Sequence, residues 1–103
     1  MFKLVAVYKV PENKDAFESH YKEVHMPLTV KIPRIKEVRM NRVFGGPMGK
    51  SELHLITELC FVSKEDFKAA MSTPEAMASG KDAMSFAKNL VSVHFAEETV
   101  QKL

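Results

Sequence analysis

Strand-like and helix-like segments follow one another along this chain in an order that few folds can accommodate. Four segments show the every-second-residue alternation and the β-branched and aromatic content that favour strands. These predicted strands cover residues 2–10, 34–44, 52–62 and 90–100. The middle two are separated by GGPMG (45–49), whose glycines and proline indicate a hairpin loop.

Helical regions are predicted after the first strand and after the third. Asn13 is a good N-cap, and Phe17 and Tyr21 belong to one apolar stripe on a helix that begins near residue 14. Ser63 opens a capping pattern, SKED, for a second helix. Thr73 can cap a further helix, and Pro74 suits its first position. This helix is predicted to run to about residue 88.

The resulting order, β-α-β-β-α-β, predicts the α+β class. A four-stranded antiparallel sheet with helices on one face is the natural arrangement for this order. The 103 residues are close to the common size of one domain, so we expect a single domain over residues 1–103. The other face of the sheet then lacks a helical cover and must be polar or be covered by another molecule.

The composition excludes several classes of function. The net charge is only +2 and acidic residues interrupt the basic ones, so we expect no nucleic-acid partner. No apolar run approaches the ~18 residues that a membrane span needs, and no secretory signal is evident, so we expect a cytoplasmic protein. Cys60 is the only cysteine, which excludes an intrachain disulfide and a cysteine-based metal cluster.

The third predicted strand has one apolar face and one mixed face. The mixed face holds Glu52, His54, Ile56, Glu58, Cys60 and Val62. Such a mixture suits neither a dry core nor a fully exposed surface, and it predicts a half-buried interface or a lined cavity. Pairing of two copies through this face would bury its apolar members and leave a pocket around its polar ones. We therefore expect a homodimer.

Glu58 keeps two interpretations open. A mid-strand carboxylate is costly unless it is solvated or paired, so Glu58 is either a salt-bridge partner or a cavity acid–base group whose pKa burial raises. His54 lies four residues earlier on the same predicted face, about 13 Å away along a strand and out of hydrogen-bond reach. Cys60 is most simply a buried apolar residue. The alternative is a nucleophilic Cys/His pair, for which no specific motif is present.

The segment SHYKEVHMPL places His25 two residues before Pro27, which we expect to end the first helix. His25 either satisfies free carbonyls at the end of the helix or projects its imidazole into a cavity. His20 falls about 140° away around a regular helix, so the two rings are expected to point apart. No metal site is predicted from this pair.

Two blocks of the sequence resemble the EthD family. The first is AFESHYKEVHMPL, with Phe17, Tyr21 and the ending His25-x-Pro27-Leu28, and the second is ITELCFVSKEDFKAAMSTPEA. Tyr21 stands where many members have tryptophan. The resemblance implies a ferredoxin-like fold that pairs sheet to sheet as a dimeric α/β barrel. It also implies a small organic substrate without fixing the reaction.

The residues and the resemblance together predict a cofactor-independent enzyme that acts by proton transfer on a small oxygenated or aromatic molecule. The reaction would be of the isomerase, dehydratase or cyclase type, as in the degradation of ethers or aromatic compounds. His25 would be the general acid–base, and Glu58 would orient it or hold a second proton. The predicted substrate-binding residues are Tyr21, His54, Ile56 and Cys60.

The alternative is a non-catalytic accessory protein of a degradation pathway that binds a small molecule in the same cavity. In that case no proton-transfer group would be essential. A haem-handling or quinol-type oxygenase of the same fold is disfavoured, because the sequence has no tryptophan and no recognisable haem-ligand motif.

Overall fold

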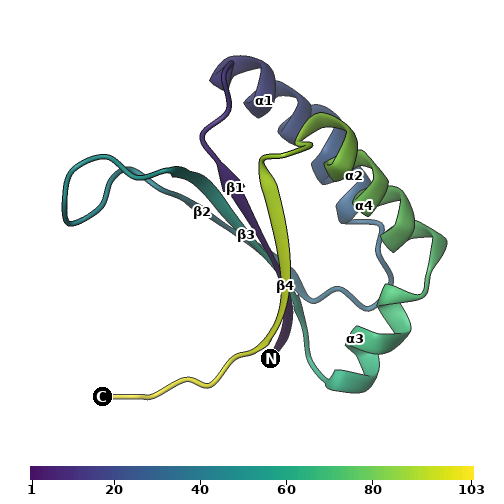
Figure 1. The fold of residues 1–103 in the computed structure, drawn as a ribbon. Coiled ribbons are helices and arrows are strands. Elements are labelled where there is room, and N and C mark those ends of the chain that lie inside the picture. The colour runs from purple at the N-terminus through teal and green to yellow at the C-terminus, as the bar shows by residue number, and fades with distance from the viewer.

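The fold is a four-stranded antiparallel sheet with all its helices on one side (Figure 1). The computed structural model describes residues 1–103. The strands are β1 (Phe2–Lys9), β2 (Glu37–Arg42), β3 (Leu53–Phe61) and β4 (Val91–Glu97), in the spatial order β2-β3-β1-β4. The predicted α+β class, strand order along the chain and uncovered sheet face are confirmed.

The helical elements all lie over the same face of the sheet (Figure 1). They are α1 (Lys14–His20), the π-helical turn η1 (Tyr21–His25), α2 (Met26–Thr29), α3 (Lys64–Met71) and α4 (Pro74–Phe86). None of these helices combines the length and the apolar character that crossing a membrane requires.

Three of the helices begin where side-chain caps were predicted. The Asn13 side chain accepts a hydrogen bond from the third backbone N–H of α1 at 2.9 Å. Ser63 and Thr73 do the same for α3 and α4, at 3.1 and 3.2 Å. Each cap satisfies one of the free N–H groups at a helix start, so the sequence determines these boundaries locally.

The sequence predicted that the first helical region ends at Pro27. This is wrong, because the helical region continues through Pro27 to Thr29. The Met26 N–H donates to the Tyr21 carbonyl, five residues earlier, and the chain continues as α2. A π turn is wider than an α turn and follows an i→i+5 pattern, so it accommodates Pro27, which has no N–H to donate. The same pattern places residues five apart on one side of the helix.

The core lies between the sheet and the helices. One cluster gathers Tyr8, Phe17 and Tyr21 with buried residues of β1 and β3, and the Tyr8 ring packs edge-on against both other rings at 5.3 and 6.0 Å. A second cluster surrounds Leu59 and Phe61, under α3. The predicted inward stripe of the first helix thus supplies the main aromatic contacts with the sheet.

β3 departs from strict alternation at His54. The pairing of β1 with β3 shifts register between Tyr8 and Lys9, which leaves His54 as an extra residue in β3. This bulge turns His54 toward α1, where its Nε2 lies 2.6 Å from the Glu18 carboxylate. The prediction that His54 shares a face with Glu58 is therefore wrong, because alternation holds only where the pairing has no bulge.

Gly80 lies in the middle of α4, where a Cβ atom would meet nothing within 4 Å. Glycine in a helix interior costs roughly 0.5–1 kcal/mol relative to alanine. We therefore expect Gly80→Ala to raise the free energy of unfolding in urea by about this amount. Ala78→Gly, at an exposed position of the same helix, should lower it by a similar amount. Equal stability of Gly80→Ala and the unmodified chain would contradict this account of α4.

Candidate functional site

A cavity of about 110 Å³ lies between the sheet and α4. Residues such as Tyr8 and Thr57 line it from β1 and β3. The residues that α4 contributes are all small: Ala76, Ser79, Gly80 and Ala83. Their spacing puts them on one face of the helix, and side chains of this size leave the space above the sheet unfilled.

His25 lines this cavity and is only 6% exposed. Its Nδ1 lies 2.9 Å from the carboxylate of Asp82, which comes from α4. A carboxylate that is ionised can only accept, so Nδ1 carries the proton and donates it to Asp82. Nε2 is then the unprotonated nitrogen of the imidazole.

The Nε2 atom of His25 has one polar neighbour, the Thr29 hydroxyl, at 3.4 Å. That hydroxyl donates to the backbone carbonyl of His25 at 3.0 Å, so its hydrogen is not directed at the ring. Ser79, which also lines the cavity, lies 2.8 Å from the same hydroxyl. The Nε2 lone pair therefore has no strong donor in the protein and can act as a base.

Asp82 also binds His20, whose Nε2 lies 2.9 Å from the other carboxylate oxygen. The prediction that His20 and His25 point apart is wrong, because it assumed a regular α-helix where η1 inserts a π turn. The ring of Phe86 packs against both imidazoles, with ring centroids 4.4 Å from that of His20 and 5.2 Å from that of His25.

Burial lowers the pKa of His25, and the hydrogen bond to Asp82 offsets part of this effect. A lowered pKa keeps the imidazole neutral at neutral pH, which is the form that a general base needs. Burial also raises the pKa of Tyr8, with a further contribution from the charge of Asp82. The Tyr8 hydroxyl therefore stays protonated and can donate a hydrogen bond inside the cavity.

Tyr21 does not line the cavity but contacts a residue that does. Its hydroxyl forms a short hydrogen bond with the hydroxyl of Thr57, which does line the cavity. The centroids of the Tyr21 and His25 rings are 5.7 Å apart. Of the residues predicted for the site, Tyr21 is thus the one that the structure places next to His25.

Glu58 lies on the opposite side of the sheet from His25. Its carboxylate pairs with the ammonium of Lys3 and accepts a hydrogen bond from Asn41 at 2.9 Å. The contact with Lys3 lowers the pKa of Glu58. The salt-bridge interpretation therefore holds, and the prediction that Glu58 orients His25 or has a raised pKa is wrong.

Ile56 and Cys60 share the side of β3 that carries Glu58, so they do not line the His25 cavity either. Cys60 is fully buried, as predicted for an apolar role, and burial raises the pKa of its thiol. The pocket predicted from the mixed face and the cavity that contains His25 are on different sides of the sheet.

Sequence reasoning missed Asp82, Tyr8, Thr57 and Ser79. Asp82 is far from His25 along the chain, and no spacing rule connects them. One signal was present, because small residues recur on the inward face of the helix 74–86 around a mid-helix glycine. A helix face without bulky side chains leaves space over a sheet, which indicates a cavity.

The fold and the cavity together define a class: ferredoxin-like α+β domains with a small internal cavity between sheet and helices. The EthD domain model matches residues 9–89. The chain therefore belongs to the EthD family.

Two relatives match this chain over nearly its whole length. The crystal structure of an ethyl tert-butyl ether d (EthD) family protein from Bacillus halodurans is 44% identical, covers 96% of this chain and 99% of its own, and superposes with a TM-score of 0.92. An uncharacterised 11.0 kDa protein from the thcB-thcC intergenic region of Rhodococcus erythropolis is 28% identical over 98 residues, 95% of either chain.

More distant structures share the fold alone. A dimeric protein of unknown function from Bacteroides fragilis is 19% identical, with a TM-score of 0.63 over 94% of this chain and 95% of its own. SnoaB, a cofactor-independent oxygenase from Streptomyces nogalater, is 12% identical, with a TM-score of 0.64 over 99% of this chain and 94% of its own.

The lowered pKa of His25 predicts how stability depends on pH. Above the reference pKa of ~6.5, the His25 imidazole is neutral in both the folded and the unfolded chain. As the pH falls below that value, the imidazole of the unfolded chain is protonated before that of the folded chain. Stability is thus fully present above about pH 6.5 and is lost as the pH falls toward the lower pKa of the folded state. We expect the unmodified chain to lose more unfolding free energy than His25→Asn between about pH 7.5 and about pH 5.5.

Urea titrations at several pH values measure this difference. The asparagine amide can still donate to Asp82, so the variant keeps that contact and removes the titrating ring. His94→Asn, at an exposed position of β4, is the control and should follow the unmodified chain. Parallel pH profiles for His25→Asn and the unmodified chain would show that His25 does not titrate as described.

Proposed function

We propose that this protein is an enzyme that transfers protons on a small oxygenated or aromatic molecule without a cofactor, with His25 as general acid–base. The observation that carries this proposal is the neutral, buried imidazole at the cavity, held through Nδ1 by Asp82, with only a long contact of 3.4 Å from the Thr29 hydroxyl to Nε2. Isomerisation, dehydration and cyclisation each need only such transfers.

The neighbouring groups support a defined course for the proton. His25 Nε2 takes a proton from a carbon of the substrate, and the carboxylate of Asp82 stabilises the imidazolium that forms. The neutral Tyr8 hydroxyl and the hydroxyls of Thr57 and Ser79 line the same cavity and can donate to an oxygen on which negative charge develops. The imidazolium then returns the proton to another substrate atom, which restores the enzyme.

The likeness to SnoaB, which is described as a cofactor-independent oxygenase and differs at most positions, supports catalysis without a cofactor only by analogy of fold. A role in ether or aromatic degradation and a cytoplasmic location stay predictions from the sequence. The second candidate function, a non-catalytic module that binds a small molecule, uses the same cavity and needs no proton transfer.

Exchange of C–H for deuterium in D₂O tests proton transfer directly, whichever overall reaction the protein catalyses. A panel of small ketones, lactones and aromatic carbonyl compounds is incubated with the protein and followed by proton NMR. We expect one or more compounds to exchange faster with the protein, and His25→Asn to slow that exchange by about 10²-fold or more. Asp82→Asn should slow it as well, because the imidazole loses its anionic partner.

His94→Asn serves as the matched control, because His94 is exposed on β4 and outside the cavity. The His94→Asn variant should catalyse deuterium exchange of the compounds at the same rate as the unmodified chain. Tight binding of a compound with no exchange by any variant would favour the binding module over the enzyme. Exchange that persists in His25→Asn would remove His25 from the mechanism.

We further propose that two copies pair through the uncovered face of the sheet. The half-buried apolar side chains of Val5, Val7 and Ile56 lie on this face, beside ion pairs that include Lys3 with Glu58. The loop between β2 and β3 and the C-terminal residues both project from this side (Figure 1). The structurally similar protein from Bacteroides fragilis is described as dimeric, which supports a homodimer here without indicating which face pairs.

Ile56→Glu tests the pairing, because a carboxylate at the centre of an apolar interface loses its hydration without a partner. Sedimentation velocity should show a dimer for the unmodified chain and a monomer for this variant. Met84→Glu is the control, since Met84 is 58% exposed on α4 and should leave the dimer intact. A monomeric unmodified chain, or a dimer that survives Ile56→Glu, would contradict this interface.

A further inference from the structure

We propose that a groove beside the His25 cavity is a second subsite that takes the apolar body of an organic carboxylate, with the carboxylate next to Lys64 and Lys68. The groove lies between α3 and the ends of β1 and β4. This inference rests on the proposed function and specifies its substrate class: an amphipathic acid with an aromatic or other bulky apolar group.

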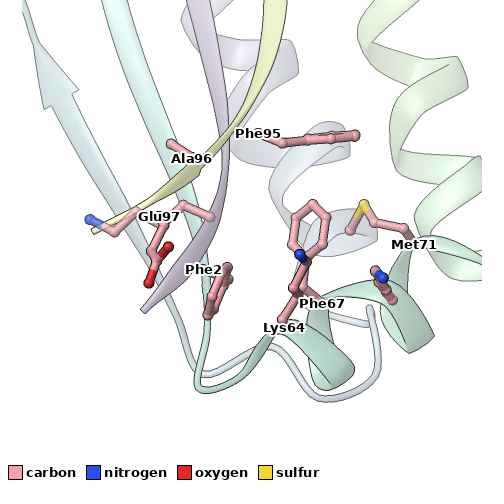
Figure 2. A pocket seen from close by; sticks show the side chains of 9 residues that line it. Phe2, Lys64, Phe67, Met71, Phe95, Ala96 and Glu97 are labelled. Atoms are coloured by element: carbon pink, nitrogen blue, oxygen red, sulfur yellow. The ribbon is translucent and has the colours of Figure 1, made fainter. Parts of the chain in front are cut away.

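Aromatic side chains form the walls of the groove. Phe67 of α3 and Phe95 of β4 meet edge to face with ring centroids 5.0 Å apart, and Phe2 and Met71 line the groove beside them. Figure 2 shows Phe95 extending from β4 toward Phe67 and Met71, with Phe2 at the end of β1. These contacts build a concave apolar surface of the kind that binds small organic molecules.

Phe95 is unusually exposed for its position. It pairs with Leu4 of β1 on the side of the sheet that the helices cover, yet it is 68% exposed. β4 is an edge strand, and α3 stops short of covering it, so the ring borders the groove. A large apolar side chain that stays open to water on an otherwise covered face indicates a surface that something else covers.

The chain itself does not supply that cover. The C-terminal residues leave the sheet on the side away from the helices, as does the loop between β2 and β3 (Figure 1). The proposed dimer interface is on that same far side. The groove is therefore left to a ligand.

The relative sizes of the two spaces favour one ligand that uses both. The cavity measures about 110 Å³, room for only a few non-hydrogen atoms, whereas the groove measures about 490 Å³. Met71 lines both spaces, so they adjoin at this flexible side chain. A reactive group can enter the cavity while the larger apolar part of the same molecule occupies the groove.

The charges on the groove select an anion. Lys64 and Lys68 are four residues apart on α3, so their side chains lie on one face of the helix, and both line the groove. Neither takes part in an ion pair in the structure. Lys3 also lines the groove, but its ammonium is bound by Glu58 and Glu98. The two free ammonium groups are thus available to a ligand carboxylate at the α3 end.

Glu97 makes the arrangement directional. It lines the groove from β4, on the opposite side from Lys64 of α3 (Figure 2). A ligand carboxylate next to Glu97 would meet like charge, and one next to Lys64 and Lys68 would meet opposite charge. The geometry therefore fixes which end of the groove holds the anion.

Binding of 3-phenylpropionate and of its neutral amide, 3-phenylpropionamide, tests the proposal. The two probes have the same shape and differ in charge. Dissociation constants are measured by NMR from the methyl resonance of Met71 in protein labelled at methionine methyl groups, assigned with Met71→Leu. We expect the acid to bind about tenfold more tightly than the amide at low salt, and this preference to shrink as salt is added.

The double variant Lys64→Gln/Lys68→Gln should bind acid and amide equally. Lys81→Gln/Lys88→Gln removes the same charge from exposed positions outside the groove and should keep the preference for the acid. Phe95→Ala should weaken the binding of both probes by the same factor, because it removes apolar contact and leaves the lysines in place.

Equal binding of the two probes by the unmodified chain, or an unchanged preference in Lys64→Gln/Lys68→Gln, overturns the proposal. So does the absence of any shift at Met71. These outcomes are separate from those of the proposed function: a groove that prefers the acid supports the subsite even if His25→Asn leaves deuterium exchange unchanged. Conversely, if deuterium exchange depends on His25 but the groove does not prefer the acid, the proposed enzyme activity stands and the proposed subsite is wrong.

Discussion

The carboxylate of Asp82 holds together the helices that cover the sheet beside the cavity. It accepts hydrogen bonds from His20 and His25, and so joins α4 to the helix that runs from α1 through η1. The contact depends on the π turn, because residues five apart share a side of the helix only where the turn is widened. In a regular α-helix, His25 would turn away from Asp82, and nothing would fix which ring nitrogen carries the proton.

The cavity and the uncovered face of the sheet hold ionisable groups in different states. The cavity on the covered side is lined by groups that stay neutral, such as His25 and the Tyr8 hydroxyl, and the carboxylate that His25 contacts, Asp82, is bound by two imidazoles. The uncovered side holds full charges in pairs, such as Lys3 with Glu58. A buried charge without a partner is costly, whereas a neutral base in a water-poor cavity stays reactive. The chemistry is therefore expected on the covered side.

Local patterns predicted most of the fold but only part of the site. Caps such as Asn13 and the alternation of the strands are properties of neighbouring residues, and they placed the elements correctly. His54 was misplaced because a single bulge reverses the face of a strand residue without leaving a mark in the alternation. Asp82 was missed because its partnership with His25 arises only when α4 packs on the first helical region. Tertiary packing creates that contact, and a spacing rule within one element cannot reveal it.

The cavity exists because of what α4 lacks. Its inward residues Ala76, Ser79, Gly80 and Ala83 fill too little space to reach the sheet, and the gap they leave is the cavity beside His25. The protein from Bacillus halodurans shares this fold with a TM-score of 0.92, and SnoaB shares it at 12% identity. A sheet and helices that tolerate so many substitutions do not by themselves specify a reaction. Within this fold, bulkier residues on that face of α4 would close the cavity and leave the imidazole of His25 as a packed core residue. The size of a few side chains on one helix therefore decides whether His25 borders a cavity at all.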